Sequence, residues 1–228
     1  GNIFGALDND SIFLMAKNGK NIQMASLNDF IPIHSRQHVN GVYYSAGYFW
    51  VVTTSSVFAL KCDGGIQFAQ LYDIGLVHSC PSGSAVPYCN GLVVIADKAM
   101  AVIDAVHKTS YMNGIGLAAN HLPVIFRKGD FSVRTFKIDN SKIPMGAALV
   151  NLGNNKILAV PHAGGPWVVD ISSGQTRKSS LRLPGAVISM SRHGSHTFIG
   201  TDNGLCIYDS ESGFLTNIAE RYRKPVNN

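Results

Sequence analysis

Charged side chains and long apolar segments are both scarce in this sequence. Asp, Glu, Lys and Arg make up 14% of the 228 residues, well below the share of about 25% that is usual for soluble domains. No apolar run approaches the roughly 20 residues that a membrane-spanning helix needs. The N-terminus also lacks the basic and apolar segments of a secretion signal. These absences argue against a disordered chain and predict a soluble, compact protein without a membrane span.

Motifs that mark common catalytic and metal sites are also absent. The four cysteines form no CxxC pair and no zinc-finger spacing, so we expect no zinc site. The sequence has neither a GxSxG nucleophile elbow nor a GxxxxGKS/T phosphate-binding loop. His34 with His38, and His193 with His196, form close pairs, but on loops or hairpins their spacing fixes no common face for a metal. We therefore predict no catalytic residues and no metal ligands.

The cysteines leave one alternative open. Cys80 and Cys89 flank a loop rich in proline, glycine and serine. In an oxidising compartment these two could close a small hairpin disulfide, and otherwise they stay thiols. Cys62 and Cys206 fall on expected strands, where we predict that they act as small buried hydrophobic residues.

The balance of charge is basic but dispersed. The sequence contains 19 Lys and Arg residues and 14 Asp and Glu residues, which gives a net charge of +5. A field of this sign favours acidic partners weakly. Because the basic residues are spread along the chain, we do not expect a nucleic-acid surface. The chain begins GNIF, without an initiator methionine, so we expect a processed product or a piece of a longer protein.

A short apolar run followed by a polar turn recurs along the chain. We call the residue that closes each apolar run its anchor. The best copy is HTFIGTDNGLCIYDSESGFL, residues 196–215, and WVVDISSG repeats its second half closely. The anchors of the six copies are Met15, Lys61, Asp104, Lys137, Asp170 and Asp209. Alternating apolar and polar residues, interrupted at short intervals by Asp, Asn or Gly, are typical of antiparallel strands joined by tight hairpins.

The spacing of these copies predicts the fold. A period of about 40 residues with several strands per repeat is typical of a β-propeller, a ring of small sheets called blades. The missing 3.6-residue pattern excludes helical repeats. We predict one all-β domain over residues 1–228, a six-bladed propeller of four-stranded antiparallel blades closed by pairing of the N- and C-terminal segments. The predicted blades are residues 1–30, 38–73, 82–113, 114–144, 145–181 and 184–220, with the tail 221–228 closing the ring.

The repeated sequence pattern also resembles that of a known class of proteins. TFIGTDNGLCIYDSESG, and more loosely ILAVPHAGGPWVVDISSG and LVVIADKAMAVIDAVHKT, resemble β-propeller repeats of the YVTN and quinoprotein-like kind. The Trp-Asp and Gly-His signature of WD40 repeats is not present. The chain also looks like the small propellers of phage tail and attachment proteins. Propellers of this class serve as enzymes, lectins, scaffolds and viral parts, so the resemblance implies an architecture and not an activity.

The predicted ligand site follows from this architecture. In a propeller, the turns between the second and third strands lie on one face with the crossovers between blades, around the mouth of the central channel. The polar residues that we predict at this mouth are Asp8, Asp10, Asp97, Lys98, Arg127, Lys128, Asp130, His162, Asp202 and Asn203. Their alternative role is to bond the backbone of the turns. Carboxylates from several turns would suit Ca²⁺, and no other cofactor is predicted.

Two further clusters admit two interpretations each. The densest aromatic patch is Tyr43, Tyr44, Tyr48, Phe49 and Trp50. It predicts either a stacking surface or a strand pair that buries about half of its rings. The basic residues Arg177, Lys178 and Arg182 are more typical of a solvated face than of an anion site.

The leading functional prediction is a non-catalytic binding or scaffold module. It would recognise a protein or glycan partner through the loop-bearing face of the propeller. One alternative is a component of a viral or phage tail or attachment structure. The other is a small propeller enzyme, a hydrolase or lyase, with its site at the channel mouth.

Overall fold

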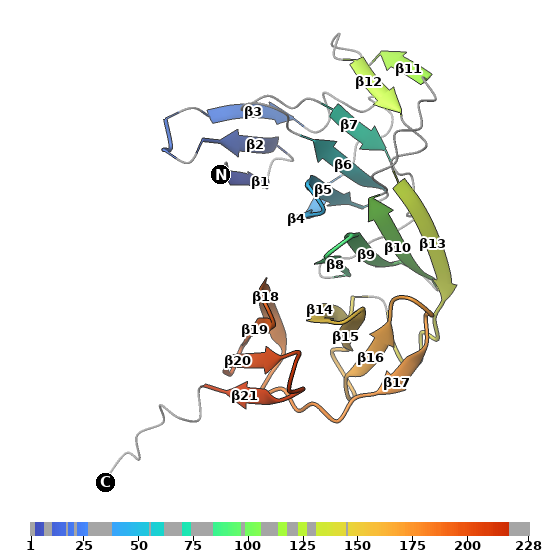
Figure 1. The fold of residues 1–228 in the computed structure, drawn as a ribbon, viewed down its shortest axis with the longest axis vertical. Coiled ribbons are helices and arrows are strands. Elements are labelled where there is room, and N and C mark those ends of the chain that lie inside the picture. The colour runs from blue at the N-terminus through green and yellow to red at the C-terminus, as the bar shows by residue number, and fades with distance from the viewer. Residues whose placement is uncertain are drawn as a thin grey trace. The chain divides into compact units, whose positions relative to one another are not determined.

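The computed structural model consists of β-strands. It describes residues 3–6, 11–16, 18–20, 22–26, 38–54, 56–61, 70–73, 84–96, 99–105, 114–117, 123–126, 131–144 and 146–218. All regular elements in these ranges are strands, arranged in six sheets (Figure 1), so the predicted all-β class is confirmed. Two compact units result, Gly1–Asp97 with Ala101–Thr135, and Lys98–Met100 with Phe136–Asn228. No helix among the described residues is long and apolar enough to cross a membrane.

The first unit begins with a three-stranded sheet. Its order is β1-β2-β3, made of β1 (Ile3–Ala6), β2 (Ser11–Met15) and β3 (Ile22–Ser26). The next sheet has the order β4-β5-β6-β7, with β4 (Val39–Ser45), β5 (Tyr48–Thr53), β6 (Val57–Lys61) and β7 (Gln70–Asp73).

The third sheet and a hairpin follow. The sheet has the order β8-β9-β10-β13, with β8 (Ala85–Tyr88), β9 (Gly91–Ala96), β10 (Ala99–Ala105) and β13 (Phe131–Lys137). The hairpin pairs β11 (Gly114–Leu117) with β12 (Pro123–Phe126). The hairpin strands therefore lie, in sequence, between the last two strands of the third sheet.

The second unit holds two four-stranded sheets in sequential order. One is made of β14 (Ala148–Gly153), β15 (Lys156–Val160), β16 (Trp167–Asp170) and β17 (Thr176–Lys178). The other is made of β18 (Val187–His193), β19 (His196–Thr201), β20 (Gly204–Asp209) and β21 (Leu215–Asn217). Both are drawn from yellow to red in Figure 1.

The turn that repeats in the second unit explains the recurring Asp and Gly. The amide of Gly174 donates to the carbonyl of Asp170, and the amide of Gly213 donates to that of Asp209, both at 2.8 Å. Each glycine has a positive φ, +72° and +74°, a backbone conformation that disfavours residues with a Cβ. The Asp170 carboxylate accepts from the amides of Ser172 and Ser173 at 2.9 Å. The Asp therefore caps the turn and the Gly closes it.

The prediction of six four-stranded blades is wrong. Four sheets have the four strands of a blade, and the first sheet has three among the described residues. The predicted fourth blade, 114–144, is not a blade because β13 pairs with β10 as the outer strand of the third sheet. Arg134 on β13 donates to the Asp104 carboxylate on β10 at 3.1 Å, so two predicted anchor repeats share one sheet. The predicted closing tail, 221–228, lies outside the described residues.

Neighbouring sheets pack through apolar faces within each unit. In the first unit, Trp50 and Ala59 belong to a buried cluster with Leu92 and Val94 of the next sheet. Trp50 is fully buried, and Tyr48 is nearly so, whereas Tyr44 is 62% exposed. The aromatic patch is thus divided between core and surface, as strand alternation predicts.

The equivalent cluster of the second unit joins its two sheets. Leu158 and Val168 pack with Ile199 and Cys206. All four side chains are buried, so this contact removes apolar surface from water and stabilises the pair of sheets.

Candidate functional site

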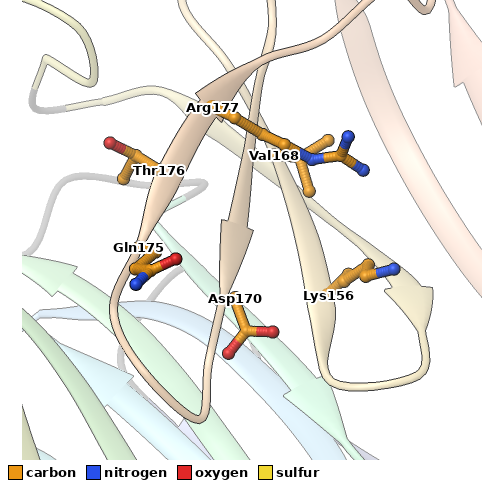
Figure 2. Close-up of a pocket in the computed structure, with 6 residues that line it drawn as sticks. All are labelled: Lys156, Val168, Asp170, Gln175, Thr176 and Arg177. Atoms are coloured by element: carbon orange, nitrogen blue, oxygen red, sulfur yellow. The ribbon is translucent and has the colours of Figure 1, made fainter.

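A polar cleft lies on the β14–β17 sheet of the second unit. It has a volume of about 290 Å³. Its lining residues, drawn in Figure 2, are Lys156, Val168, Asp170, Gln175, Thr176 and Arg177. They come from β15, from β16 and from the start of β17 with its preceding turn. The cleft is therefore built on regular strands, which hold its side chains in fixed directions.

Strand register brings the charged groups of the cleft together. Lys156 on β15 pairs with Asp170 on β16, and Val168 on β16 pairs with Arg177 on β17. Because side chains alternate along a strand, Val168 and Asp170 lie on one face, and their partners share it. Figure 2 shows the Lys156 and Arg177 side chains reaching toward the same side of this sheet.

The electrostatics of the cleft favour an anionic ligand. Partial burial tends to raise the pKa of Asp170, but hydrogen bonds from Ser173 and Ser172 outweigh it and lower the pKa, helped by the positive charge of Lys156. The carboxylate is therefore charged at neutral pH and is held by its own turn. Within the described part of the chain, neither the Lys156 ammonium nor the Arg177 guanidinium donates a hydrogen bond or lies within salt-bridge distance of a carboxylate, although the charge of Lys156 acts on Asp170. Two cationic groups thus remain available beside one occupied carboxylate.

A second polar cluster joins the two sheets of the second unit. The Thr197 hydroxyl donates to the carbonyl of Asn151 at 2.7 Å. Arg192 donates through Nη1 to the Thr197 hydroxyl at 3.1 Å and through Nη2 to the Ser210 hydroxyl at 3.3 Å. Asn154 donates to the carbonyl of Ser210 at 3.2 Å. Because each of these groups bonds another sheet element, we assign the cluster a structural role.

The third polar cluster belongs to the first unit. The Tyr88 hydroxyl donates to the Asp104 carboxylate, and Arg134 donates to the same carboxylate through Nε and Nη2, at 3.2 and 3.1 Å. Burial, followed by the hydrogen bond and charge of Asp104, raises the pKa of Tyr88 well above its usual value. Tyr88 is thus kept protonated as a donor, and this cluster ties β8 to β10 and β13.

Three of the ten predicted rim residues are among the described residues. The other seven lie outside them: Asp8, Asp10, Asp97, Lys98, Arg127, Lys128 and Asp130. The other three, His162, Asp202 and Asn203, lie in the turns between the second and third strands of their sheets. In the β14–β17 sheet, the turn of His162 joins the end of β15 to the start of β16, whereas the cleft residue Lys156 begins β15 and the cleft residue Asp170 ends β16.

Two of these rim residues bond the crossover that leads into β18. Asp202 Oδ1 accepts from the amide of Ala186 at 2.8 Å. Asn203 Nδ2 donates to the carbonyl of Pro184 at 3.1 Å. Both side chains therefore bond backbone groups. The sequence analysis gave backbone bonding as the alternative role, but within the turns, whereas these bonds go to the crossover. His162 is exposed on the turn between β15 and β16.

The sequence analysis did not predict that Lys156 and Arg177 line the same cleft. Arg177 was considered only as part of a solvated basic patch, and Lys156 carried no motif. The available signal was the predicted antiparallel order of the strands in each blade, because antiparallel pairing aligns the start of β15 with the end of β16. The two cations are 21 positions apart in sequence and meet only through register.

Metal and thiol chemistry have few candidates in the described ranges. No group of three or more His, Cys, Asp or Glu side chains in these ranges could hold a metal ion. Four carboxylates that we predicted as possible Ca²⁺ ligands fall outside them: Asp8, Asp10, Asp97 and Asp130. Cys89 is an exposed free thiol, and Cys80 lies outside the described residues.

Comparison with known proteins supports the fold class. No protein-family model and no curated protein match the sequence. The structure is similar to the WD40 β-propeller domain of Doa1, with a TM-score of 0.55 and 13% identity over 95% of this chain and 62% of that one. It is also similar to a chain of the Mitotic Checkpoint Complex, with a TM-score of 0.51 and 11% identity over 95% of this chain and 61% of that one.

These similarities establish the predicted β-propeller fold. The chain spans about three fifths of the length of both similar structures. The kinship with YVTN and quinoprotein-like repeats remains a prediction.

Proposed function

We propose that the protein is a non-catalytic binding module that takes an acidic segment of a partner protein into the cleft on β15, β16 and β17. The observation that carries this proposal is the pair of cationic side chains, Lys156 and Arg177, beside an open cleft of about 290 Å³. The propeller fold hosts unrelated functions, so the proposal rests on the cleft and not on the fold.

The chemistry of the cleft favours carboxylates over cations. Asp170 is committed to its turn through Ser172 and Ser173, whereas the two cations have their donors available. A guanidinium and an ammonium bind carboxylates by charge-assisted hydrogen bonds. Val168 adds apolar lining to the cleft, which suits a segment that mixes acidic and aliphatic residues. The net charge of +5 draws such a partner toward the protein.

The turn-bearing rim is proposed as a second contact area. Its three described residues, His162, Asp202 and Asn203, are all exposed, and Asp202 and Asn203 shape it by holding the crossover. A partner protein that reached both ends of the β14–β17 sheet would contact the cleft and the rim together.

The cleft can be tested with a fluorescein-labelled peptide in which glutamate and valine alternate. Fluorescence anisotropy is expected to report saturable binding that weakens as NaCl is raised, because salt screens the charge contacts. Arg177→Glu and Lys156→Glu should each weaken binding by roughly fivefold or more, since reversal replaces an attraction with a repulsion.

Lys178→Glu is the matched control. It makes the same change of charge one residue away from Arg177, at a position that does not line the cleft. The same peptide with glutamine for glutamate is the second control and should bind much more weakly. Equal loss of binding in Arg177→Glu and Lys178→Glu would contradict the proposal, because only net charge would then matter.

A further inference from the structure

A short basic strand forms one edge of the β14–β17 sheet. The order of this sheet is β14-β15-β16-β17, so β17 pairs with β16 on one side only. Arg177 and Lys178 on β17 are both exposed. β21, the last strand of the other sheet of this unit, has the sequence LTN and carries no charge. β17 is therefore an edge strand distinguished by two adjacent cations.

The hydrogen bonds of the β16–β17 hairpin show how the backbone of β17 is turned. The amide of Asp170 donates to the carbonyl of Gln175, and the amide of Ser179 donates to the carbonyl of Pro166, both at 2.9 Å. Hydrogen-bonded and non-hydrogen-bonded residue pairs alternate along an antiparallel ladder. The pair halfway between these two, which contains Arg177, is therefore also hydrogen-bonded. The N–H and C=O groups of Arg177 thus point to β16.

The backbone groups on either side of Arg177 point away from the sheet. They are the N–H and C=O groups of Thr176 and Lys178, the other two residues of β17. In the described part of the chain, these outward groups have no hydrogen-bond partner. The connection that follows leads to the neighbouring sheet, since Leu181 and Leu183 pack on the cluster that joins the two sheets. β17 therefore offers two donors and two acceptors to a further strand.

The charges of β17 restrict which strand can pair with it. Proteins protect open edges with short strands and with charged side chains, Lys above all, and β17 has three residues of which two are cationic. A second copy of β17 would bring like charges opposite one another, which is destabilising. The same charges attract an acidic strand. This edge therefore discriminates against basic strands and selects acidic ones.

We propose that the acidic segment of the partner binds as an additional antiparallel strand along β17. This inference rests on the function proposed above and specifies the conformation in which the partner is recognised. Strand addition to an open sheet edge is a general mode of peptide recognition, in which backbone hydrogen bonds supply affinity and alternate side chains supply specificity. The added strand is antiparallel because each described strand pair of this sheet is antiparallel.

The register of the added strand places an acidic side chain against Arg177. A residue opposite Arg177 forms a non-hydrogen-bonded pair with it, which is the closer of the two kinds of pair. Arg177 lies on the same face of the sheet as Val168, its partner on β16, and both line the cleft. A glutamate at this place therefore meets the guanidinium on the cleft side.

The neighbours of that glutamate fall on the other face of the sheet. They lie opposite Thr176 and Lys178, and in Figure 2 the Thr176 side chain points away from that of Arg177. The methyl group of Thr176 and the aliphatic stem of Lys178 suit aliphatic partners such as valine. In the peptide of alternating glutamate and valine, the valine amides therefore point to β17 and the glutamate amides point away from it.

Two N-methylated forms of the fluorescein-labelled peptide test this register. With equal numbers of glutamate and valine, one form is methylated at every valine amide and the other at every glutamate amide, so their compositions are identical. Methylation of the valine amides removes the donors to β17 and puts methyl groups into the strand contact. Fluorescence anisotropy should show at least about tenfold weaker binding for this peptide than for the unmodified one. The glutamate-methylated peptide should bind within about twofold of the unmodified peptide.

Amide hydrogen exchange followed by NMR locates the contact on the protein. The unmodified peptide should slow exchange of the Thr176 and Lys178 amides by about tenfold or more, because both amides gain an acceptor. The Arg177 amide is the internal control, since it already points to β16 and should be slowed much less.

The outcomes separate strand addition from the proposed function of the cleft. Equal affinity of the two methylated peptides, or a loss confined to the glutamate-methylated one, would overturn strand addition. The cleft proposal would then still stand if Arg177→Glu weakened binding of the unmodified peptide and Lys178→Glu did not. Failure of the unmodified peptide to bind would overturn both.

Discussion

The buried hydroxyl of Thr197 offers a direct test of how the two sheets of the second unit are joined. Thr197 has no solvent exposure. Its hydroxyl donates to the carbonyl of Asn151 on β14 at 2.7 Å and accepts from Arg192 at 3.1 Å. Thr197→Val keeps the shape of the side chain and removes both hydrogen bonds. Thr197→Ser keeps the hydroxyl and removes one methyl group.

The structure sets the expected order of stability. Leaving a buried polar partner without its hydrogen bond costs about 1–3 kcal/mol. The half-buried guanidinium of Arg192 keeps some access to water, so we expect a loss of about 2 kcal/mol for Thr197→Val. Loss of one buried methyl costs about 0.8 kcal/mol. Thr197→Ser should therefore be the more stable of the two variants.

Urea unfolding followed by circular dichroism, together with calorimetry, measures this order. For a chain of this length, about 2 kcal/mol corresponds to a fall in melting temperature of roughly 4–8 °C, and the serine variant should lose about half as much. A valine variant as stable as the wild type, and more stable than the serine variant, would refute the reasoning. The sheets would then be joined by apolar packing alone.

Two further predictions concern Gly153, which lies beside Arg192 of the same cluster, and Tyr88 of the first unit. Gly153 has a φ of +77°, and a Cβ there would collide with the Arg192 guanidinium. Gly153→Ala should therefore lower the free energy of unfolding, measured in urea, by at least about 1 kcal/mol. Gly194→Ala is the control, because a Cβ there meets open space at a φ of +57°, so this variant should lose only the free energy that the positive φ costs a residue with a Cβ. The raised pKa of Tyr88 means that its contribution to stability is complete below pH about 10 and declines above it, because the unfolded chain then releases the proton first. Tyr88→Phe should flatten this alkaline decline, and an unchanged slope between pH 9 and pH 11 would contradict the assignment.

Local patterns in the sequence predicted strands and turns well. The copy at residues 196–215, from which the repeat was defined, forms the two strands His196–Thr201 and Gly204–Asp209 joined by a tight turn, as its alternation predicted. These signals are local, because alternation and turn chemistry act over a few neighbouring residues. The all-β class and the propeller fold followed from their repetition.

The pairing of strands was less predictable. β13 was read as part of a fourth blade, but it pairs with β10 across the hairpin of β11 and β12. Nothing in the pattern of a strand specifies which distant strand it will join, since any exposed edge can supply the hydrogen bonds. The count of blades depended on this choice, and so it was wrong.

Some features of the candidate site also follow from the local sequence, and others depend on contacts between distant residues. The sequence by itself determined the turn of Asp170 and Gly174, because an Asp that bonds its own backbone and a Gly that accepts a positive φ are properties of single residues. Only the tertiary structure decided that Lys156 and Arg177 share a cleft, that β17 forms an edge of its sheet, and that Trp50 and Leu158 are buried. Register and sheet stacking act between residues far apart in the chain, and burial depends on which sheet, if any, lies on top.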